Sequence, residues 1–241
     1  MILPPQFERT CILVKEAGIE KLASQHVFLA GLGGVGSYCA EALARGGIGR
    51  LTLLDHDVVA ASNINRQLPA LISTVGRSKA ELMAERISDI NPQCRVTISR
   101  AFLTAENVNE IVPADADYVI DAIDSLNCKV ALVAESFHRG LKVASSMGAG
   151  NKLDPSRIRL ADISETRICP LASQMRKRLR KRGVESGVIA VYTDEPPRPP
   201  LPPEPVSGRG RPRAVNGTIS YMPPLFGFML AGAVIKALLE S

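Results

Sequence analysis

A glycine-rich turn near the N-terminus constrains the fold more than any other feature of the sequence. The apolar run His26–Ala30 leads into Gly31-Leu32-Gly33-Gly34-Val35-Gly36, and a helical pattern follows over residues 37–45. Glycine is needed where a tight turn has a positive φ, and where a side chain would keep the backbone from a phosphate at a helix N-terminus. We therefore expect a phosphate-binding turn formed by Gly31, Gly33, Gly34 and Gly36.

Apolar, strand-like runs then alternate with helical patterns. The runs lie at residues 51–54, 96–98, 118–123 and 141–145, and an amphipathic stretch covers residues 78–90. This alternation is typical of right-handed βαβ units. With 241 residues, of which 46% are hydrophobic, the chain can bury one ordinary core. The sequence predicts an α/β fold, with a Rossmann-like, mostly parallel sheet and helices on both faces.

The pattern loosens after Gly150, so we divide the chain into a core at residues 1–150 and an extension at residues 151–241. The extension is expected to hold strands at 157–163 and 188–192 and a basic helix at 171–182. Eight of the 17 prolines lie from Pro196 to Pro212, within a proline- and arginine-rich segment at residues 195–213. Such a segment is extended or disordered and cannot be core. A strand within residues 216–224 and a helix at residues 225–240 should return to the core.

The second strand ends at Asp55, about 20 residues beyond the glycine turn. A carboxylate there can accept hydrogen bonds from ribose hydroxyls, so the two features together predict an adenine nucleotide. The glycine pattern is weak evidence by itself. Taken alone, it favours an NAD-dependent oxidoreductase.

The residues after Asp55 favour a triphosphate. The loop contains Asn63-Ile64-Asn65-Arg66-Gln67, and Gly76-Arg77-Ser78-Lys79 begins the next helix. A triphosphate calls for cationic side chains and a metal ion, whereas bridging phosphates of a dinucleotide are served largely by backbone amides. Arg66 and Lys79 can supply the cations. Asp124 follows the fourth strand at the carboxyl edge of the sheet, opposite the phosphates, where it would form a magnesium site.

These motifs, together with Asp121-Ala122-Ile123-Asp124, resemble the adenylating domain of the ubiquitin-activating-like superfamily, which includes the ThiF and MoeB enzymes. The resemblance covers Phe7 to about Gly150. It implies that ATP is bound by the four glycines and by Asp55, Asp57, Asn63, Arg66, Gln67 and Lys79. It also implies that Asp124 holds magnesium, and that Arg9 reaches across a homodimer into the partner's nucleotide site. Arg66, Lys79, Asp124 and Arg9 are the candidate catalytic residues.

Over nearly the whole chain the sequence is similar to the bacterial threonylcarbamoyladenosine dehydratases, the TcdA or CsdL family. The segments that carry this likeness are 118–125, 148–155, Cys169-Pro170-Leu171-Ala172 and 216–220. The likeness implies cyclisation of threonylcarbamoyladenosine beside the anticodon of tRNA, through an acyl-adenylate of the threonyl carboxylate. It also implies association with cysteine desulfurase or sulfur-acceptor proteins. An activator of a ubiquitin-like or sulfur-carrier protein is the alternative, and a non-catalytic nucleotide-sensing module is a third class.

The five cysteines are scattered singly, without a Cys-x-x-Cys pair. Neither a disulfide framework nor a zinc ribbon is indicated, so we expect no zinc and a reducing cytoplasm. Sulfur-carrier activators of the ThiF and MoeB type usually carry two zinc-binding cysteine pairs, which counts against that alternative. Cys169 is the one cysteine near a region where such enzymes use a thiol, but cyclisation needs no covalent intermediate.

The excess positive charge is regional. Residues 165–213 hold 11 basic and 5 acidic residues, although the whole chain has a net charge of only +5. Arg176, Lys177, Arg178, Arg180, Lys181 and Arg182 form the densest run. A run of this kind is often a solvated helix face, and in this context it predicts a surface that follows tRNA phosphates.

Neither terminus predicts export or a membrane span. The sequence MILPPQFERT lacks a basic region followed by a long apolar run, so no signal peptide is expected. The uncharged stretch at residues 220–235 has Pro223 and Pro224 near its start and ends before Lys236. We expect a buried helix there rather than a spanning one, with peripheral membrane contact as the alternative.

Overall fold

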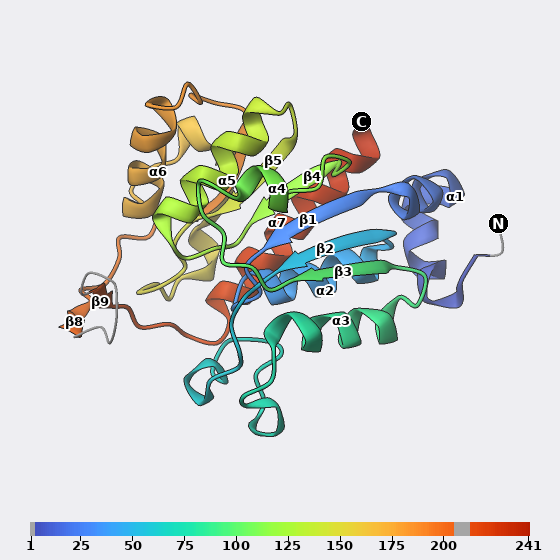
Figure 1. Cartoon of the computed structure of the whole chain (residues 1–241), viewed down its shortest axis with the longest axis horizontal. Coiled ribbons are helices and arrows are strands. Elements are labelled where there is room, and N and C mark those ends of the chain that lie inside the picture. The colour runs from blue at the N-terminus through green and yellow to red at the C-terminus, as the bar shows by residue number, and fades with distance from the viewer. Residues whose placement is uncertain (1–2, 205–212) are drawn as a thin grey trace.

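A seven-stranded sheet runs through the molecule in the order β3-β2-β1-β4-β5-β7-β6 (Figure 1). The computed structural model describes residues 3–204 and 213–241. Every neighbouring pair is parallel except β6 with β7, which is antiparallel. The strands are β1 His26–Ala30, β2 Arg50–Leu54, β3 Arg95–Ser99, β4 Tyr118–Asp121, β5 Lys142–Ser146, β6 Ile158–Asp162 and β7 Val188–Thr193. The predicted α/β fold with a mostly parallel sheet is confirmed.

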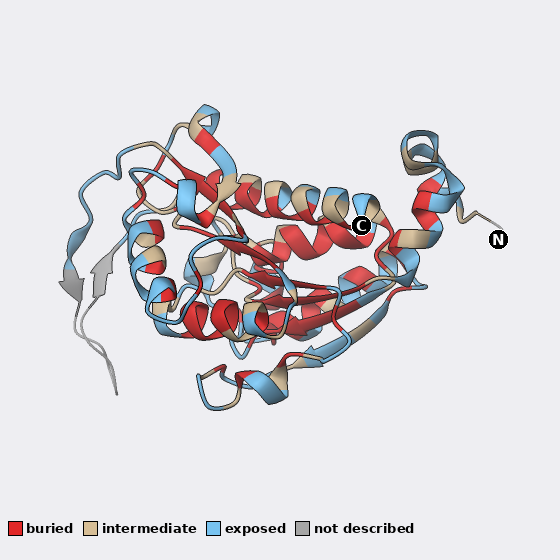
Figure 2. Ribbon diagram, turned by 90° about the horizontal axis from the view of Figure 1, so that it is seen from above, coloured by how far each residue is buried: buried red, intermediate tan, exposed pale blue. Residues whose placement is uncertain are grey.

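Helices cover both faces of this sheet and bury its side chains. One core contains residues of α1 Glu8–Ser24, α2 Gly36–Gly46, α3 Lys79–Ile90 and α7 Met222–Glu240. The other core contains residues of α4 Val108–Ile111, α5 Leu126–His138 and α6 Pro170–Arg180. Buried residues therefore run through the centre of the molecule, between two helical layers (Figure 2). All five residues of β1 are buried, as expected for a central parallel strand.

Short 3-10 helices lie in the connections between these elements. They are η1 Pro5–Phe7, η2 Ala61–Asn63, η3 Ile72–Thr74, η4 Pro155–Arg157 and η5 Ile163–Glu165. Parallel pairing places the last residues of β1, β2 and β4 at one edge, because Ala30 pairs with both Leu54 and Asp121. The loops that leave this carboxyl edge carry most of the candidate residues.

The last helix begins earlier than the sequence analysis expected. It starts at Met222, with Pro223 and Pro224 in its first turn. Proline is tolerated there because the N–H groups of a first turn have no acceptor within the helix. Because of this, α7 has 19 residues and is long and apolar enough to cross a membrane, although half of its most apolar 18-residue stretch is buried. Phe226, Leu230 and Val234 belong to the core that includes α2. The expectation of a buried helix is confirmed, and its expected start was wrong.

The extension at residues 151–241 contributes to the same sheet as the core. β7 pairs with β5, β6 pairs with β7, and α7 packs against the first core's helices. The proline-rich segment includes β8 Leu201–Glu204 and β9 Arg213–Val215, which pair only with each other. Residues 205–212 lie outside the described residues. Residues 216–219 form a loop without the expected strand, because β9 ends at Val215.

Candidate active site

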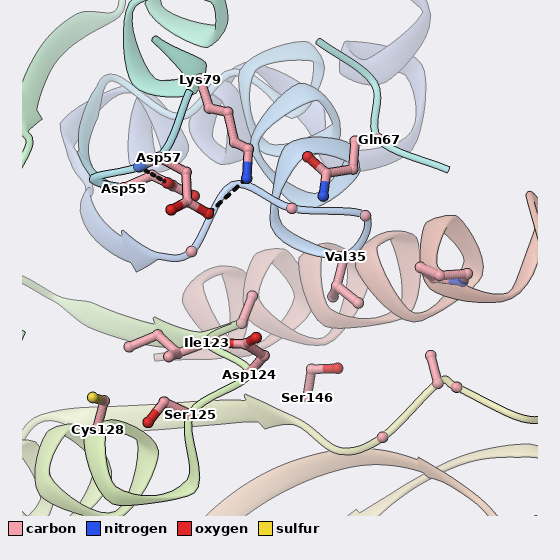
Figure 3. A pocket seen from close by; sticks show the side chains of 18 of the residues that line it. Val35, Asp55, Asp57, Gln67, Lys79, Ile123, Asp124, Ser125, Cys128 and Ser146 are labelled. Atoms are coloured by element: carbon pink, nitrogen blue, oxygen red, sulfur yellow. Dashed lines mark hydrogen bonds and ion pairs between the residues drawn. The ribbon is translucent and has the colours of Figure 1, made fainter. Parts of the chain in front are cut away.

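A cavity of about 470 Å³ lies at the carboxyl edge of the sheet, where the loops after β1, β2, β4 and β5 meet. Figure 3 shows Lys79, Asp55 and Asp57 on one side of it and Asp124, Ser125 and Ser146 on the other. Ligands of open α/β folds bind in this position. Most of the candidate ATP-binding residues are brought together here: Gly31, Gly33, Gly34, Asp55, Asp57, Arg66, Gln67, Lys79 and Asp124 all line the cavity.

The glycines of the turn are required for different reasons. Gly31 has φ +90°, and a Cβ on it would lie 2.6 Å from the carbonyl oxygen of Ala122. A Cβ on Gly36 would lie 1.7 Å from the carbonyl oxygen of Gly31, so Gly36 closes the turn without lining the cavity. At Gly33 the nearest atom to a Cβ is Nε2 of Gln67, 3.6 Å away. The fold thus leaves space over Gly33 that a phosphate can use.

The second side of the cavity is built on Asp55. Its Oδ2 accepts a hydrogen bond from the backbone N–H of Leu32 at 2.6 Å, and its Oδ1 accepts one from the N–H of Asp57 at 2.8 Å. The carboxylate therefore ties the glycine turn to the end of β2. Asp57 in turn pairs with Nζ of Lys79 at 2.8 Å, and the Lys79 side chain is 5% exposed. This pair holds a buried ammonium group at the cavity wall before any phosphate binds.

The loop between β2 and α3 supplies Arg66 and Gln67. Nη1 of Arg66 donates to the carbonyl oxygen of Ser62 at 3.0 Å and to Oδ1 of Asn65 at 2.7 Å. Oε1 of the buried Gln67 has no hydrogen-bond partner in the described part of the chain. A buried amide oxygen without a partner is costly, and a ligand in the cavity can satisfy it.

Asn63 does not line the cavity. Its Oδ1 accepts a hydrogen bond from the N–H of Ala60 at 3.1 Å, so it stabilises the loop that carries Arg66. The expected contact of Asn63 with the triphosphate stays a prediction, and the family pattern alone supports it.

Asp124 lies beyond the end of β4, exposed in the cavity, and its loop is fixed by a buried ion pair that the sequence analysis missed. Nζ of Lys129 lies 2.8 Å from Oδ2 of Asp121, and the two side chains are 1% and 0% exposed. Lys129 also donates to the carbonyl oxygen of Ile123 at 2.9 Å, and Ser145 donates to Asp121 at 2.6 Å. The signal in the sequence was a lysine next to the apolar run at residues 130–134, eight residues after Asp121.

A second group of lining residues comes from the extension and was also missed. The end of β5 and the following residues 146–150 form one wall, and Asn216 and Thr218 complete it. The loop at residues 216–218 is separated from β5 by 70 residues of sequence. Their proximity depends on the path of the chain through β6, α6 and β7, which local sequence patterns do not specify.

Arg9 is exposed on α1 and does not line the cavity. Because α1 precedes β1, it lies at the amino edge of the sheet, away from the site (Figure 1). Cys169 is 3% exposed at the N-terminus of α6 and is also outside the cavity lining. Its neighbour Lys152 is buried, and this desolvation holds the pKa of Lys152 below its usual value.

The basic helix α6 has one buried face, formed by Ala172, Met175 and Leu179. The basic residues therefore do not surround the helix. Arg176 donates to the carbonyl oxygen of Thr166 at 2.9 Å and so has a structural partner. Arg178, Lys181 and Arg182 line a second cavity of about 700 Å³, which shares Phe102, Leu103, Ser125 and Cys128 with the first. The basic surface thus adjoins the candidate nucleotide site.

Comparisons with known proteins agree with this geometry. The chain is 41% identical to tRNA threonylcarbamoyladenosine dehydratase of Bacillus subtilis, over 98% of this chain and 95% of that protein. It is 38% identical to the enzyme of that name from Haemophilus influenzae, over 92% of this chain and 89% of that protein.

A crystal structure of E. coli tRNA N6-threonylcarbamoyladenosine dehydratase, TcdA, in complex with ATP is 36% identical and has a TM-score of 0.85. It covers 98% of this chain and 94% of the TcdA chain. The model of the ThiF family matches residues 7–241. Because that match includes the glycine turn, the cavity and the extension, the chain belongs to the ThiF family.

Proposed function

We propose that this protein is an ATP-dependent tRNA threonylcarbamoyladenosine dehydratase. It activates the threonyl carboxylate of the modified adenosine as an acyl-adenylate and closes it into the cyclic form. One observation carries the proposal: Arg66 and Lys79 lie in the same cavity as Asp124, beside a glycine turn with open space over Gly33. This set of charges suits a triphosphate, and the dehydratases similar to the chain over nearly its whole length support the choice of substrate.

The chemistry requires charge stabilisation more than a protein nucleophile. A free carboxylate is a poor electrophile because its leaving group would be oxide. One of its oxygens attacks the α-phosphorus of ATP, the bond from that phosphorus to pyrophosphate breaks, and an acyl-adenylate forms. The carbamoyl oxygen of the same side chain then attacks the acyl carbon, AMP leaves, and a carbamoyl nitrogen loses its proton to give the neutral ring. Intramolecular attack has effective molarities on the order of 10⁵ M or more, so Cys169 is not needed as a nucleophile.

Arg66 and Lys79 would bind the phosphates, and the four glycines would place backbone N–H groups around them. Asp55 would accept hydrogen bonds from the ribose. Asp124 offers a carboxylate that has no ion-pair or hydrogen-bond partner among the described residues, which fits a site for magnesium. Bound there, magnesium would offset the negative charge of the phosphates. The buried pair of Lys129 and Asp121 would keep the Asp124 loop in place.

The test is to incubate the protein with ATP, magnesium and threonylcarbamoylated tRNA. We expect mass spectrometry to detect the loss of one water from the modified nucleoside, together with AMP and pyrophosphate. Asp124→Asn should abolish AMP formation and leave the melting temperature unchanged. A protein that left the tRNA unchanged but adenylated the C-terminus of a sulfur-carrier protein would contradict the proposal and favour the alternative activity.

We propose that α6 and its C-terminal turn bind the tRNA backbone, with Arg178, Lys181 and Arg182 at the cavity and Lys177 and Arg180 exposed beside them. Reversing the charge of Arg178, Lys181 and Arg182 should weaken tRNA binding. It should also lower the slope of the logarithm of the binding constant against the logarithm of the salt concentration by up to about three. ATP affinity should not change. Reversal of Lys142, Arg95 and Lys236 is the control, because these exposed side chains lie elsewhere. An equal loss in both triple variants would argue against α6.

The protein is also proposed to act as a homodimer in the cytoplasm, with magnesium and without zinc. Leu13 and Ile72 are 83% and 84% exposed, and large exposed apolar side chains of this kind often lie in interfaces. In such a dimer Arg9 would reach the nucleotide site of the partner. Contact with a cysteine desulfurase or a sulfur-acceptor protein remains a prediction from the family resemblance.

A further inference from the structure

The side-chain amide of Asn65 connects two parts of the cavity that come from distant segments. Its Nδ2 donates to the carbonyl oxygen of Thr218 at 3.0 Å, across 153 positions of sequence. Its Oδ1 accepts from Nη1 of Arg66 at 2.7 Å. One small amide group therefore touches both the loop of the candidate phosphate-binding arginine and the loop from the extension.

Arg66 can keep this contact while it binds a phosphate. Its Nη1 makes both of its hydrogen bonds within the protein, to Asn65 and to the carbonyl oxygen of Ser62. Among the described residues, its Nε and Nη2 have no partner. A guanidinium group has five N–H donors in a fixed plane. A phosphate bound to the remaining donors would therefore fix the position of Asn65 as well.

The loop at residues 216–218 also makes hydrogen bonds on its other side, to Asn151. The backbone N–H of Asn151 donates to the carbonyl oxygen of Gly217 at 2.8 Å, and its side-chain Nδ2 donates to Oδ1 of Asn216 at 2.8 Å. The N–H of Gly217 donates to Oδ1 of Asn151 at 2.7 Å. Asn151 has φ +58°, a conformation that asparagine tolerates better than most residues. The loop is thus attached to Asn151 at one side and to Asn65 at the other.

This loop and residues 146–150 line the same cavity as the residues that would hold ATP. The glycine turn, Asp55 and Lys79 would hold ATP, whereas Asn216 and Thr218 lie with residues 146–150 on another wall. The second substrate must approach the α-phosphate from within the same cavity. Neutral amide and hydroxyl groups at this wall suit the carbamoyl and hydroxyl groups of the acid substrate.

We propose that Asn65 is a positioning residue that couples ATP binding at Arg66 to the wall that receives the carboxylic acid substrate. The inference rests on the proposed function and assigns the loop at residues 216–218 to its second substrate. A triphosphate that immobilises Arg66 also immobilises Asn65 and Thr218, so the acid substrate meets a wall that is already ordered. By linkage, the acid substrate must strengthen ATP binding by the same factor.

The experiment measures binding of an ATP analogue with a methylene group between its α- and β-phosphates, in the presence and absence of threonylcarbamoylated tRNA. In the wild-type protein we expect each ligand to tighten the other about tenfold, within the usual range for coupled sites. Asn65→Asp keeps an acceptor for Arg66 and removes the donor to Thr218. Its carboxylate also competes with phosphate for Arg66, so the analogue alone should bind more weakly. The coupling, which is the ratio of the analogue's Kd without tRNA to its Kd with tRNA in the same variant, should fall from about tenfold to about onefold.

Asn65→Leu removes both hydrogen bonds and should also lose the coupling. Ser73→Ala is the matched control, because Ser73 is exposed and lies in the same segment between β2 and α3. This variant should keep the coupling. Melting temperatures separate these effects from unfolding. Full coupling in Asn65→Asp, or none in the wild type, would overturn the inference. Because the assay measures binding, a protein with Asn65-dependent coupling that fails to dehydrate tRNA would contradict the proposed function and support this inference.

Discussion

Gly33 and Gly36 lie in the same turn but have different surroundings. A methyl group on Gly33 would lie in the open cavity with Gln67 at its border, whereas one on Gly36 would overlap the carbonyl oxygen of Gly31. The surroundings of Gly33 therefore suit contact with a ligand, whereas those of Gly36 make it a requirement of the fold. This distinction depends on atoms that are adjacent only in the folded turn.

Alanine substitutions should separate these two roles. Gly33→Ala should fold normally and raise the Kd for ATP about tenfold, equivalent to about 1.4 kcal/mol. Gly36→Ala should lower the free energy of unfolding by about 3 kcal/mol, because the added carbon overlaps backbone. Thermal unfolding and isothermal titration measure the two quantities. If both variants lost stability equally, with no specific effect on ATP, the assignment of Gly33 to the phosphate would be incorrect.

The sequence predicted the candidate functional residues by pattern and missed those that hold them in place. Arg66, Lys79 and Asp124 were predicted, and they line one cavity. The pairing of Lys129 with Asp121 was not, because a lysine in a helix is usually solvated and its burial depends on packing against β4. The partners of Arg66 are also contacts that follow from loop conformation.

At the scale of elements, the ion pairs of Glu41 connect α2 with α3. Oε1 of Glu41 lies 2.7 Å from Nη2 of Arg45 and 3.1 Å from Nη2 of Arg86. Burial raises the pKa of this carboxyl group, but the hydrogen bonds from Arg86 and Arg45 outweigh burial and hold the pKa below its usual value. The charged form is therefore the one that stabilises the packing of the two helices.

The stability contribution of Glu41 should depend on pH. Because the folded pKa lies below the unfolded one, the contribution is complete above the unfolded value and is lost as the pH falls through the folded value. Glu41→Gln should lower the free energy of unfolding by about 2 kcal/mol at pH 7 and by much less at pH 3. Denaturant unfolding across this range measures the difference. Glu110→Gln, at an exposed site on α4, is the control, and an equal pH dependence in both variants would contradict the assignment.

The order of strands and helices was predictable where the signal was local. Apolar runs predicted most of the parallel strands, and the amphipathic pattern at residues 78–90 predicted α3. The predicted start of α7 was wrong because Pro223 and Pro224 were taken to precede the helix. Proline breaks the middle of a helix but is tolerated in its first turn. The strand expected within residues 216–224 was wrong because residues 216–219 form a loop, in which Asn216 and Thr218 line the cavity, and α7 begins at Met222.

At the scale of the whole molecule, the site in one chain lacks Arg9. If the protein is a dimer in which Arg9 serves the partner's site, Arg9→Ala and Asp124→Ala should each be inactive. Mixed after reversible dissociation, the two variants should recover about a quarter of wild-type activity, because half of the dimers are mixed and each has one intact site. No recovery, with mixed dimers verified by mass spectrometry, would place Arg9 outside the partner's site.

The central claim is that a carboxylate oxygen of the substrate attacks the α-phosphorus of ATP. The most direct test uses threonylcarbamoylated tRNA with the heavy isotope of oxygen in its carboxylate group. Our account predicts that one labelled oxygen appears in AMP and none in pyrophosphate, while the nucleoside becomes cyclic. Labelled inorganic phosphate together with ADP, or cyclisation with unlabelled AMP, would contradict it.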